Sequence, residues 1–389
     1  MEVAAEKDIL HEIMTCIQCG SCSSSCPGAD NLDLTRRQLW RMLQMGLVEE
    51  AMSTELFWQC TTCSMCEIRC PRGIPLNKII MELRERYLEK NGPYGSMQQM
   101  TTILNLTKSI TGDEPKNRLL WTENIPDITL EEREKLVKDQ AEVVYFTGCV
   151  SALFPQAYKI PQSLTRILLK GGIDFSLLGE DEWCCGYPKL AAGCGEDSIK
   201  DFAAHNIEVV KAKGAKTLLV SCPTCYHVWK NEYSNLGKQH QIEIKHYTEY
   251  LPELIKQGNI QFKTDEVTIT YHDPCDLGRK SDVIEEPREL IRLLPGVKLV
   301  EMRFTGKDSK CCGGGGNLEM TNSELSLEIA QKRVAEAMET NAQYLVTTCQ
   351  QCKRTLQNAV RKNRARLKVY DLLEFIAERI DTTTGGEAK

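Results

Sequence analysis

Long apolar runs are missing from this chain of 389 residues: no stretch of about 18 apolar residues could span a bilayer. The first residues, Met1–Lys7, contain no charged-then-apolar leader, so nothing marks the chain for export. Basic charge is also not in excess, because the formal net charge is −6, which excludes a basic nucleic-acid footprint over the whole chain. We therefore expect a cytoplasmic protein that a partner could associate with a membrane, with no direct membrane span and no nucleic-acid partner.

Cysteine, in contrast, is abundant. Of the 19 cysteines, 18 fall into four sets that form two matched pairs, and only Cys194 is left over. Without an export signal, disulfide bonds are unexpected, and clustered thiols indicate metal ligands or redox groups. The pattern predicts an iron–sulfur protein that handles electrons, with Cys194 as a small buried apolar residue.

The first pair of sets has the spacing C-x2-C-x2-C-x3-C-P near the N-terminus. In this pattern three thiolates hold one cubane cluster, and the fourth, ahead of proline, ligates the other. One [4Fe–4S] cluster is therefore assigned to Cys16, Cys19, Cys22 and Cys70, and the second to Cys60, Cys63, Cys66 and Cys26. Zinc is the alternative, but the two sets with their paired C-P ends fit no common zinc pattern.

The segments around these sets predict helices. Apolar residues recur at near-helical spacing in Leu34–Met52, and Leu76–Glu89 has one apolar face. We expect residues 1–90 to form a helical domain with two clusters. Residues 91–140 should form an ordered connector that includes a charged helix over Leu130–Asp139.

Three aromatic residues in the predicted helical domain could relay electrons: Trp40, Phe57 and Trp58. Core packing is the commoner role of aromatic side chains at helical spacing. We therefore interpret them as core residues.

Residues 141–264 and 265–389 repeat one another at an offset of about 127 residues. Each copy runs through a β-rich segment into a cysteine, a helix, a Cys-Cys-Gly turn, a long helix, a strand into C-x2-C, and a short strand with a last helix. This alternation predicts α/β layers with parallel sheets, and the duplication predicts pseudo-twofold symmetry. The expected fold is α+β multidomain: an all-α ferredoxin-like domain followed by two α/β cysteine-rich repeats.

Each repeat carries five cysteines: Cys149, Cys184, Cys185, Cys222 and Cys225 in the first, and Cys275, Cys311, Cys312, Cys349 and Cys352 in the second. The gaps before the adjacent pair are 34 and 35 residues, and the gaps after it are both 36 residues. Five thiolates exceed the four that a cubane needs. Either a differently shaped cluster or a cluster with a free thiol remains possible.

The pattern Cys…Cys-Cys-Gly…Cys-x2-Cys, present twice, resembles the CCG cysteine-rich domain family. With the helical ferredoxin domain in front, the whole order resembles the HdrD type of heterodisulfide reductase subunit, which corresponds to a fusion of HdrC with HdrB. This resemblance implies two cubane clusters and two noncubane [4Fe–4S] clusters, one on each five-cysteine set. It also implies FAD on a partner, either an HdrA-like flavoprotein or a flavin dehydrogenase, with hydrogenase, formate dehydrogenase or cytochrome modules as further partners.

Two functions are consistent with this resemblance. In the first, electrons pass through the cubanes to the paired noncubane clusters, which reduce or form a small disulfide within a larger complex; the coenzyme M–coenzyme B disulfide is one candidate. In the second, the chain is a non-catalytic electron-transfer subunit that links a flavin dehydrogenase to quinone, a cytochrome or another reductase. Ten intact cysteines favour the first function, since a simple wire does not need two substrate-competent clusters.

Candidate catalytic residues flank the cysteines of the repeats. His227 follows the first C-x2-C and His272 precedes Cys275, so either could donate a proton to a leaving thiolate or be a hydrogen-bonded wall residue. Lys189 follows the first Cys-Cys-Gly turn and could bind an anionic substrate, or could be an ordinary solvated side chain. The glycine run Gly313–Gly316 lacks the Lys-Ser/Thr ending of a phosphate loop, which favours backbone crowding as its explanation.

Overall fold

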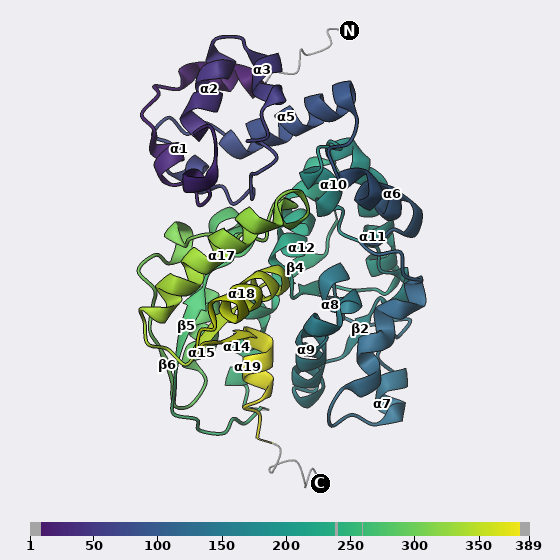
Figure 1. Ribbon diagram of the computed structural model, residues 1–389. Helices are drawn as coiled ribbons and strands as arrows, with labels where there is room; N and C mark the ends of the chain where they lie inside the picture. Colours follow the sequence, from purple (N-terminus) through teal and green to yellow (C-terminus); the bar gives the residue numbers. More distant parts are fainter. Residues whose placement is uncertain (1–8, 238–239, 259, 382–389) are drawn as a thin grey trace.

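A computed structural model describes residues 9–237, 240–258 and 260–381. Met1–Lys7, from which we expect no export leader, lie outside these ranges. No described helix is both long and apolar enough to cross a membrane. Figure 1 shows a helical N-terminal domain at one end and the two repeats side by side beneath it.

The helical domain is built from short helices around a buried apolar core that includes Trp40, Phe57 and Trp58, as expected. Its helices are α1 (Ser21–Ser24), α2 (Arg36–Gln44), α3 (Val48–Ser53), α4 (Met65–Ile68) and α5 (Leu76–Asn91). The helix predicted over Leu76–Glu89 is confirmed as α5.

The single helix predicted over Leu34–Met52 is wrong, because the chain breaks it between α2 and α3. Gly46 has φ +75°, and its N–H donates to the Leu43 carbonyl at 3.0 Å. The N–H of Leu47 donates to the Met42 carbonyl at 3.0 Å. These two hydrogen bonds form a Schellman motif, which ends α2 and redirects the chain.

The connector lies between the helical domain and the first repeat. It contains α6 (Met97–Thr107), a 3-10 helix over Pro115–Asn124, and α7 (Leu130–Glu134). The helix predicted over Leu130–Asp139 is shorter than expected because Leu136 turns into the core, where its carbonyl accepts from the Leu177 N–H at 2.8 Å. Pairing with the first repeat thus replaces the last helical turn.

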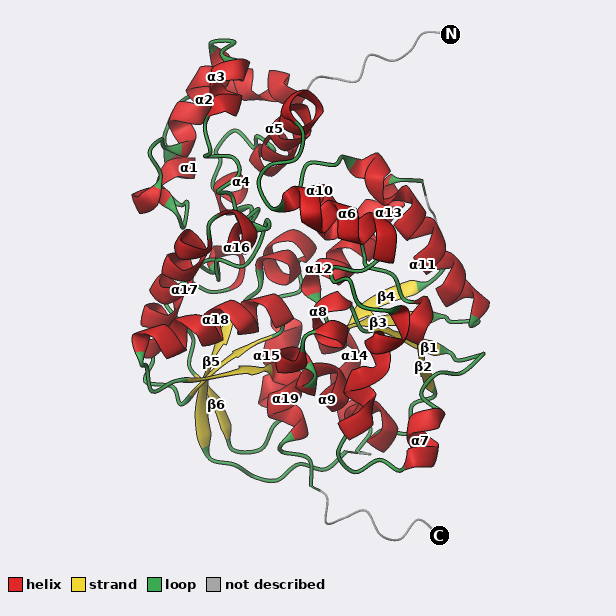
Figure 2. Cartoon of the chain, turned by 45° about the vertical axis from the view of Figure 1, so that its right-hand side comes forward, coloured by secondary structure: helices red, strands yellow, loops and turns green. Residues whose placement is uncertain are grey.

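Each repeat is a four-stranded parallel sheet with helices on its faces (Figure 2). The first repeat consists of β1 (Val143–Phe146), α8 (Cys149–Leu153), α9 (Lys159–Lys170), β2 (Phe175–Leu177), α10 (Tyr187–Ala191), α11 (Lys200–Ala212), β3 (Thr217–Val220), α12 (Pro223–His227), α13 (Tyr233–Asn235), β4 (Glu243–His246) and α14 (Tyr247–Lys256). The second consists of β5 (Val267–His272), α15 (Glu285–Arg292), β6 (Val297–Leu299), α16 (Leu318–Thr321), α17 (Ser323–Met338), β7 (Tyr344–Thr347), α18 (Gln350–Asn363), β8 (Lys368–Asp371) and α19 (Leu372–Ala377). The strand orders β2-β1-β3-β4 and β6-β5-β7-β8 match, which confirms the predicted α/β layers.

Contacts between the repeats are reciprocal, as pseudo-twofold symmetry requires. Helix α9 packs against α19, and its counterpart α15 packs against α14. Equivalent hydrogen bonds also recur: Tyr145 with Ser221 at 2.8 Å, and Tyr271 with Thr348 at 2.9 Å. One apolar cluster includes side chains from both repeats, so the pair shares a core.

A fully buried arginine on α5, Arg84, joins the helical domain to both repeats. Its guanidinium donates to five main-chain carbonyls: Phe57, Trp58 and Cys60 in the helical domain, Ala191 in the first repeat and Gly316 in the second. Hydrogen bonds from this buried guanidinium therefore hold the helical domain to both repeats.

Candidate metal centres

Two small cavities in the helical domain are each lined by four cysteines. One is lined by Cys16, Cys19, Cys22 and Cys70, and the other by Cys26, Cys60, Cys63 and Cys66. The structure thus brings the eight thiols together in the two groups that the sequence pattern assigns. Trp40 lies between the cavities and lines both of them.

The same backbone conformations recur in both motifs and turn the thiols of each motif toward one point. Two residues between the first three cysteines adopt left-handed conformations: Gln18 (φ 58°) and Gly20 (φ 84°) in the first motif, and Thr62 (φ 53°) and Ser64 (φ 57°) in the second. Such conformations are uncommon for residues other than glycine. Their recurrence at the same positions indicates that each loop is shaped around a centre of its own.

The second of these sites is buried, so thiolates formed there need positive charge nearby. Burial and the neighbouring thiols of Cys60 and Cys63 raise the pKa of Cys66 well above its usual value. Thiols bind metals as thiolates, so a bound metal would have to draw off these protons. Arg36, also buried, supplies one positive charge beside the site, and its Nη1 donates to the Leu56 carbonyl at 2.8 Å.

In each repeat, cysteines come together around the second member of the adjacent pair. Hydrogen bonds from Cys184 and Cys225 lower the pKa of the Cys185 thiol to about 6. In the second repeat, hydrogen bonds from its counterparts Cys311 and Cys352 likewise lower the pKa of Cys312. The remaining contacts join Cys149 to Cys184, Cys222 to Cys225, and Cys349 to Cys352.

The second set differs from the first in one contact that the sequence did not reveal. Where the first repeat has Cys149 beside Cys184, the second has Cys63, from the helical domain, beside Cys311. Cys275 lies close to both of these thiols. The second ferredoxin motif therefore borders the second five-cysteine set directly.

The glycine run of the second repeat makes this close approach possible. A Cβ on Gly315 would lie 2.4 Å from the Thr61 carbonyl oxygen, and one on Gly316 would lie 2.3 Å from that of Cys60. The interpretation as backbone crowding is thus supported. In the first repeat the corresponding turn continues into Tyr187, whose hydroxyl pairs with Thr62 Oγ1 at 2.6 Å.

A cavity of about 420 Å³ lies between the two repeats. It is lined by all five cysteines of the first repeat and by four of the second, namely Cys275, Cys312, Cys349 and Cys352. Asp276 and Arg354 are among its polar lining residues, and Arg354 is the only arginine or lysine among the described residues of the lining. The two thiol sets therefore face one shared space.

Sequence reasoning missed a buried ion pair beside the first set. Arg118, in the connector, pairs with Glu182 at 2.9 Å and donates to Cys149 Sγ at 3.1 Å. Both side chains are at most 4% exposed. Local patterns gave no signal for this contact, because Arg118 lies in the connector, 31 residues before the first cysteine of the repeat.

The three predicted catalytic residues lie outside the cavity lining. Lys189 Nζ donates to Asn105 Oδ1 at 2.9 Å and to the Ser198 carbonyl at 2.7 Å. His227 contacts Glu232 at 3.3 Å. His272 is buried behind the second set, and burial lowers its pKa to about 3. Cys194 is half-buried rather than fully buried and lines none of these cavities.

Comparisons with known proteins define the class of the chain. A 4Fe-4S dicluster domain matches residues 12–74, and a cysteine-rich domain matches residues 143–230 and 269–357. The chain is thus an iron–sulfur oxidoreductase subunit in which a [4Fe–4S] dicluster domain precedes two cysteine-rich repeats.

Relatives that match over nearly their whole length give the family. The chain is 33% identical to the HdrD subunit of the dihydromethanophenazine:CoB–CoM heterodisulfide reductase of Methanosarcina acetivorans, over 95% of this chain and 94% of the relative. It is 33% identical to the protein of the same name from Methanosarcina barkeri, over 96% of each chain. The chain belongs to the HdrD family of heterodisulfide reductase subunits.

More distant relatives are longer proteins. The EtfAB:quinone oxidoreductase of Syntrophomonas wolfei is 26% identical over 95% of this chain and 58% of the relative. A solved structure, a hypothetical protein from Helicobacter pylori, covers 90% of this chain and 68% of its own, with a TM-score of 0.55 and 14% identity. That likeness concerns the fold alone.

Proposed function

We propose that the chain is the disulfide-converting subunit of a larger oxidoreductase complex, in which a small disulfide is reduced, or formed, in the cavity between the repeats. The observation that carries this proposal is the single cavity lined by cysteines of both repeats. A disulfide has two sulfurs, and two thiol-rich walls facing one space can receive one sulfur each. A protein that only conducts electrons has no need for such a paired site.

The donor sets suit iron–sulfur clusters. Beside the grouped thiols, main-chain N–H groups point at cysteine sulfurs: Gly186 at Cys184 (3.4 Å) and Gly313 at Cys311 (3.3 Å). We infer two cubane [4Fe–4S] clusters on the eight N-terminal cysteines and two noncubane [4Fe–4S] clusters on the five-cysteine sets. Bound clusters would supply one-electron transfer and iron sites for sulfur.

The chain's own residues would organise this chemistry. Arg118 neutralises thiolate charge at Cys149, and Asp276 holds Lys280 at 2.8 Å beside the cavity. The cavity wall excludes bulk water from most of the thiols, since eight of the ten are buried. Arg354 pairs with Glu319, another lining residue, at 3.7 Å, and would bind an acidic group of the substrate in competition with that carboxylate.

Electrons would enter at the first ferredoxin motif. Cys19 is exposed, and the apolar side chains of Ile17 (63%) and Met45 (59%) are exposed as well. Of these two residues, Ile17 is close to Cys19 in the sequence, and Met45 directly follows α2. An exposed apolar surface of this kind suits a protein donor, which we infer to be an FAD-containing flavoprotein, HdrA-like or a dehydrogenase. The contact of Cys63 with Cys311 supports delivery to the second repeat first.

Anaerobic reconstitution tests the proposal. About 16 iron and 16 sulfide per chain are expected from four per cluster, with turnover of a disulfide panel by a reduced viologen dye. Cys185→Ser and Cys312→Ser should each abolish turnover, although the other repeat is intact, because one wall can receive only one sulfur. Saturation near half the iron, or full turnover in either variant, would refute the paired site.

A second function is favoured by one relative. The EtfAB:quinone oxidoreductase of Syntrophomonas wolfei aligns with 95% of this chain and is a longer protein. The chain would then pass electrons from a flavin dehydrogenase toward quinone, a cytochrome or another reductase through a partner. In that case no disulfide of the panel is turned over, and added thiols leave the spectrum of the oxidised protein unchanged.

A further inference from the structure

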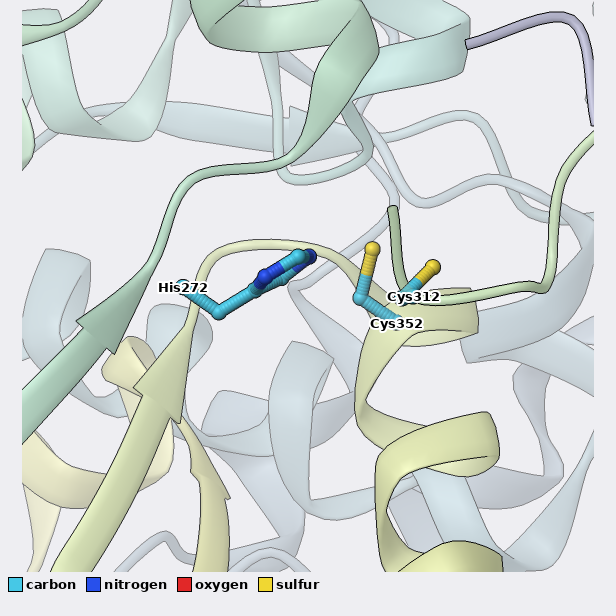
Figure 3. Close-up of side chains that lie close together, drawn as sticks. All are labelled: His272, Cys312 and Cys352. Carbon is cyan, nitrogen blue, oxygen red and sulfur yellow. The ribbon is translucent and has the colours of Figure 1, made fainter. Parts of the chain in front are cut away.

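The two repeats differ at one buried position beside their thiols. In the second repeat, β5 ends at His272, and a ring nitrogen of this residue lies within 4.8 Å of the sulfurs of Cys312 and Cys352. Figure 3 shows the imidazole pointing toward these two cysteines. In the first repeat, β1 ends at Phe146, which packs on Trp229 at 5.6 Å. Only the second site therefore has a side chain here that can form a hydrogen bond to sulfur.

Arg333 decides which nitrogen of His272 carries the proton. Arg333 Nε donates to His272 Nδ1 at 3.0 Å, and the guanidinium is held by Glu336 at 2.7 Å and by Ser309 Oγ at 3.0 Å. A guanidinium in a protein keeps its protons, so Nδ1 must accept. The imidazole is then neutral, with its single proton on Nε2. Nε2 is therefore a hydrogen-bond donor and, while it keeps that proton, not a metal ligand.

The first repeat lacks this arrangement entirely. Asn206 occupies the position that corresponds to Arg333 on the long helix of the repeat. Its amide donates to the Cys184 carbonyl at 3.2 Å and to the Tyr233 hydroxyl at 3.1 Å. Neither the histidine nor the arginine that orients it therefore has a counterpart in the first repeat.

We propose that the Nε2–H of His272 donates a hydrogen bond to sulfur at the second five-cysteine site and makes this site easier to reduce than the first. The inference rests on the proposed function, because it requires a cluster on these cysteines. Hydrogen bonds to the sulfurs raise the reduction potential of an iron–sulfur site, since reduction adds negative charge that the donor stabilises. The second site, which this hydrogen bond makes easier to reduce, is the one that borders Cys63. Electrons from the helical domain therefore arrive at the site with the higher reduction potential.

His272→Phe, which copies the first repeat, tests the role of this positioning residue. Redox titration followed by electron paramagnetic resonance should show the second site about tenfold less reduced at a fixed potential, which is 59 mV for a one-electron couple. The first site serves as an internal control and should not move. His272→Gln, which keeps an N–H donor, should recover most of the shift.

Isotope labelling gives a readout on the unaltered protein. With ¹⁵N-histidine, the reduced second site should show a weak nitrogen coupling, as expected across a hydrogen bond. A strong coupling would mean that His272 is a ligand, and no coupling would mean that it makes no bond to sulfur; either result overturns the proposal. The same holds for an unchanged potential in His272→Phe.

Iron content keeps this test separate from that of the proposed function. Wild-type protein that lacks the second-repeat signal and binds about half of the 16 irons refutes the paired site itself. A full iron content with identical potentials in wild type and His272→Phe refutes only the role of His272.

Discussion

Replacement of Arg84 by methionine should loosen the helical domain from the repeats. The arginine donates to carbonyls of all three parts of the fold, including Ala191 at 2.7 Å and Gly316 at 3.1 Å. A methionine fills similar space but donates no hydrogen bond. Each bond to a charged group contributes about 1.5–3 kcal/mol, and each buried carbonyl left unpaired costs about 1–3 kcal/mol.

The net loss is smaller than the sum of these bonds, because the variant also avoids burying a charge, which costs several kcal/mol per ion. We expect Arg84→Met to lower the free energy of unfolding by roughly 2–4 kcal/mol, because the carbonyls that lose their donor cost more than the avoided burial of the charge recovers. Urea unfolding under anaerobic conditions, followed by tryptophan fluorescence, measures this directly. Trp58, 5.2 Å from the guanidinium, reports on the site.

Arg86→Met is a matched control on the same helix. Arg86 pairs with Glu82 at 2.6 Å, and both side chains are about one-third exposed. A pair of this kind contributes at most about 1 kcal/mol. If the urea midpoint of Arg84→Met coincides with that of Arg86→Met, the hydrogen bonds of Arg84 do not hold the helical domain to the repeats.

Three further changes probe other features. Gly316→Ala should lower the free energy of unfolding by roughly 2–4 kcal/mol, since φ is +61° and the new Cβ meets a carbonyl. The control Gly46→Ala, with open space around the new Cβ, should cost about 1–2 kcal/mol. Equal urea midpoints for the two variants would contradict this. Arg118→Met should cost roughly 3–5 kcal/mol by leaving a buried carboxylate unpaired, and should lower iron retention in the first repeat; unchanged iron and stability would remove its role. Burial raises the pKa of Asp371 from 3.8 to about 8, so folding takes up a proton between these values. Stability should fall as pH rises through this window, by at most about 1.4 kcal/mol per unit, and Asp371→Asn should flatten the slope in pH-dependent unfolding.

The sequence was sufficient to predict what repeats locally. The spacing of the cysteines gave the grouping of the eight N-terminal thiols, and the alternation of strands and helices gave two parallel sheets. Both depend on short-range pattern or on duplication, which a single chain displays openly.

Contacts between distant segments were not predictable in this way. Arg84, Arg118 and Cys63 acquire their roles only when the three parts of the chain dock, and a buried arginine looks like any other in sequence. The break at Gly46 was missed because apolar spacing continues across it, although a glycine there was the available signal. The candidates Lys189 and His227 follow from adjacency to cysteines, but Lys189 on α10 and His227 on α12 are not part of the cavity lining.

The loop at residues 60–62 touches both Cys-Cys-Gly turns, at Gly316 on one side and at Tyr187 on the other. The helical domain contacts both repeats but does not share their twofold symmetry, so it cannot present the same surface to each of them. The two turns must therefore diverge, one to a bare backbone and the other to a long hydrogen-bonding side chain. A duplicated pair that carried no such domain would have no geometric reason to differ there, so the docked domain makes the two repeats inequivalent.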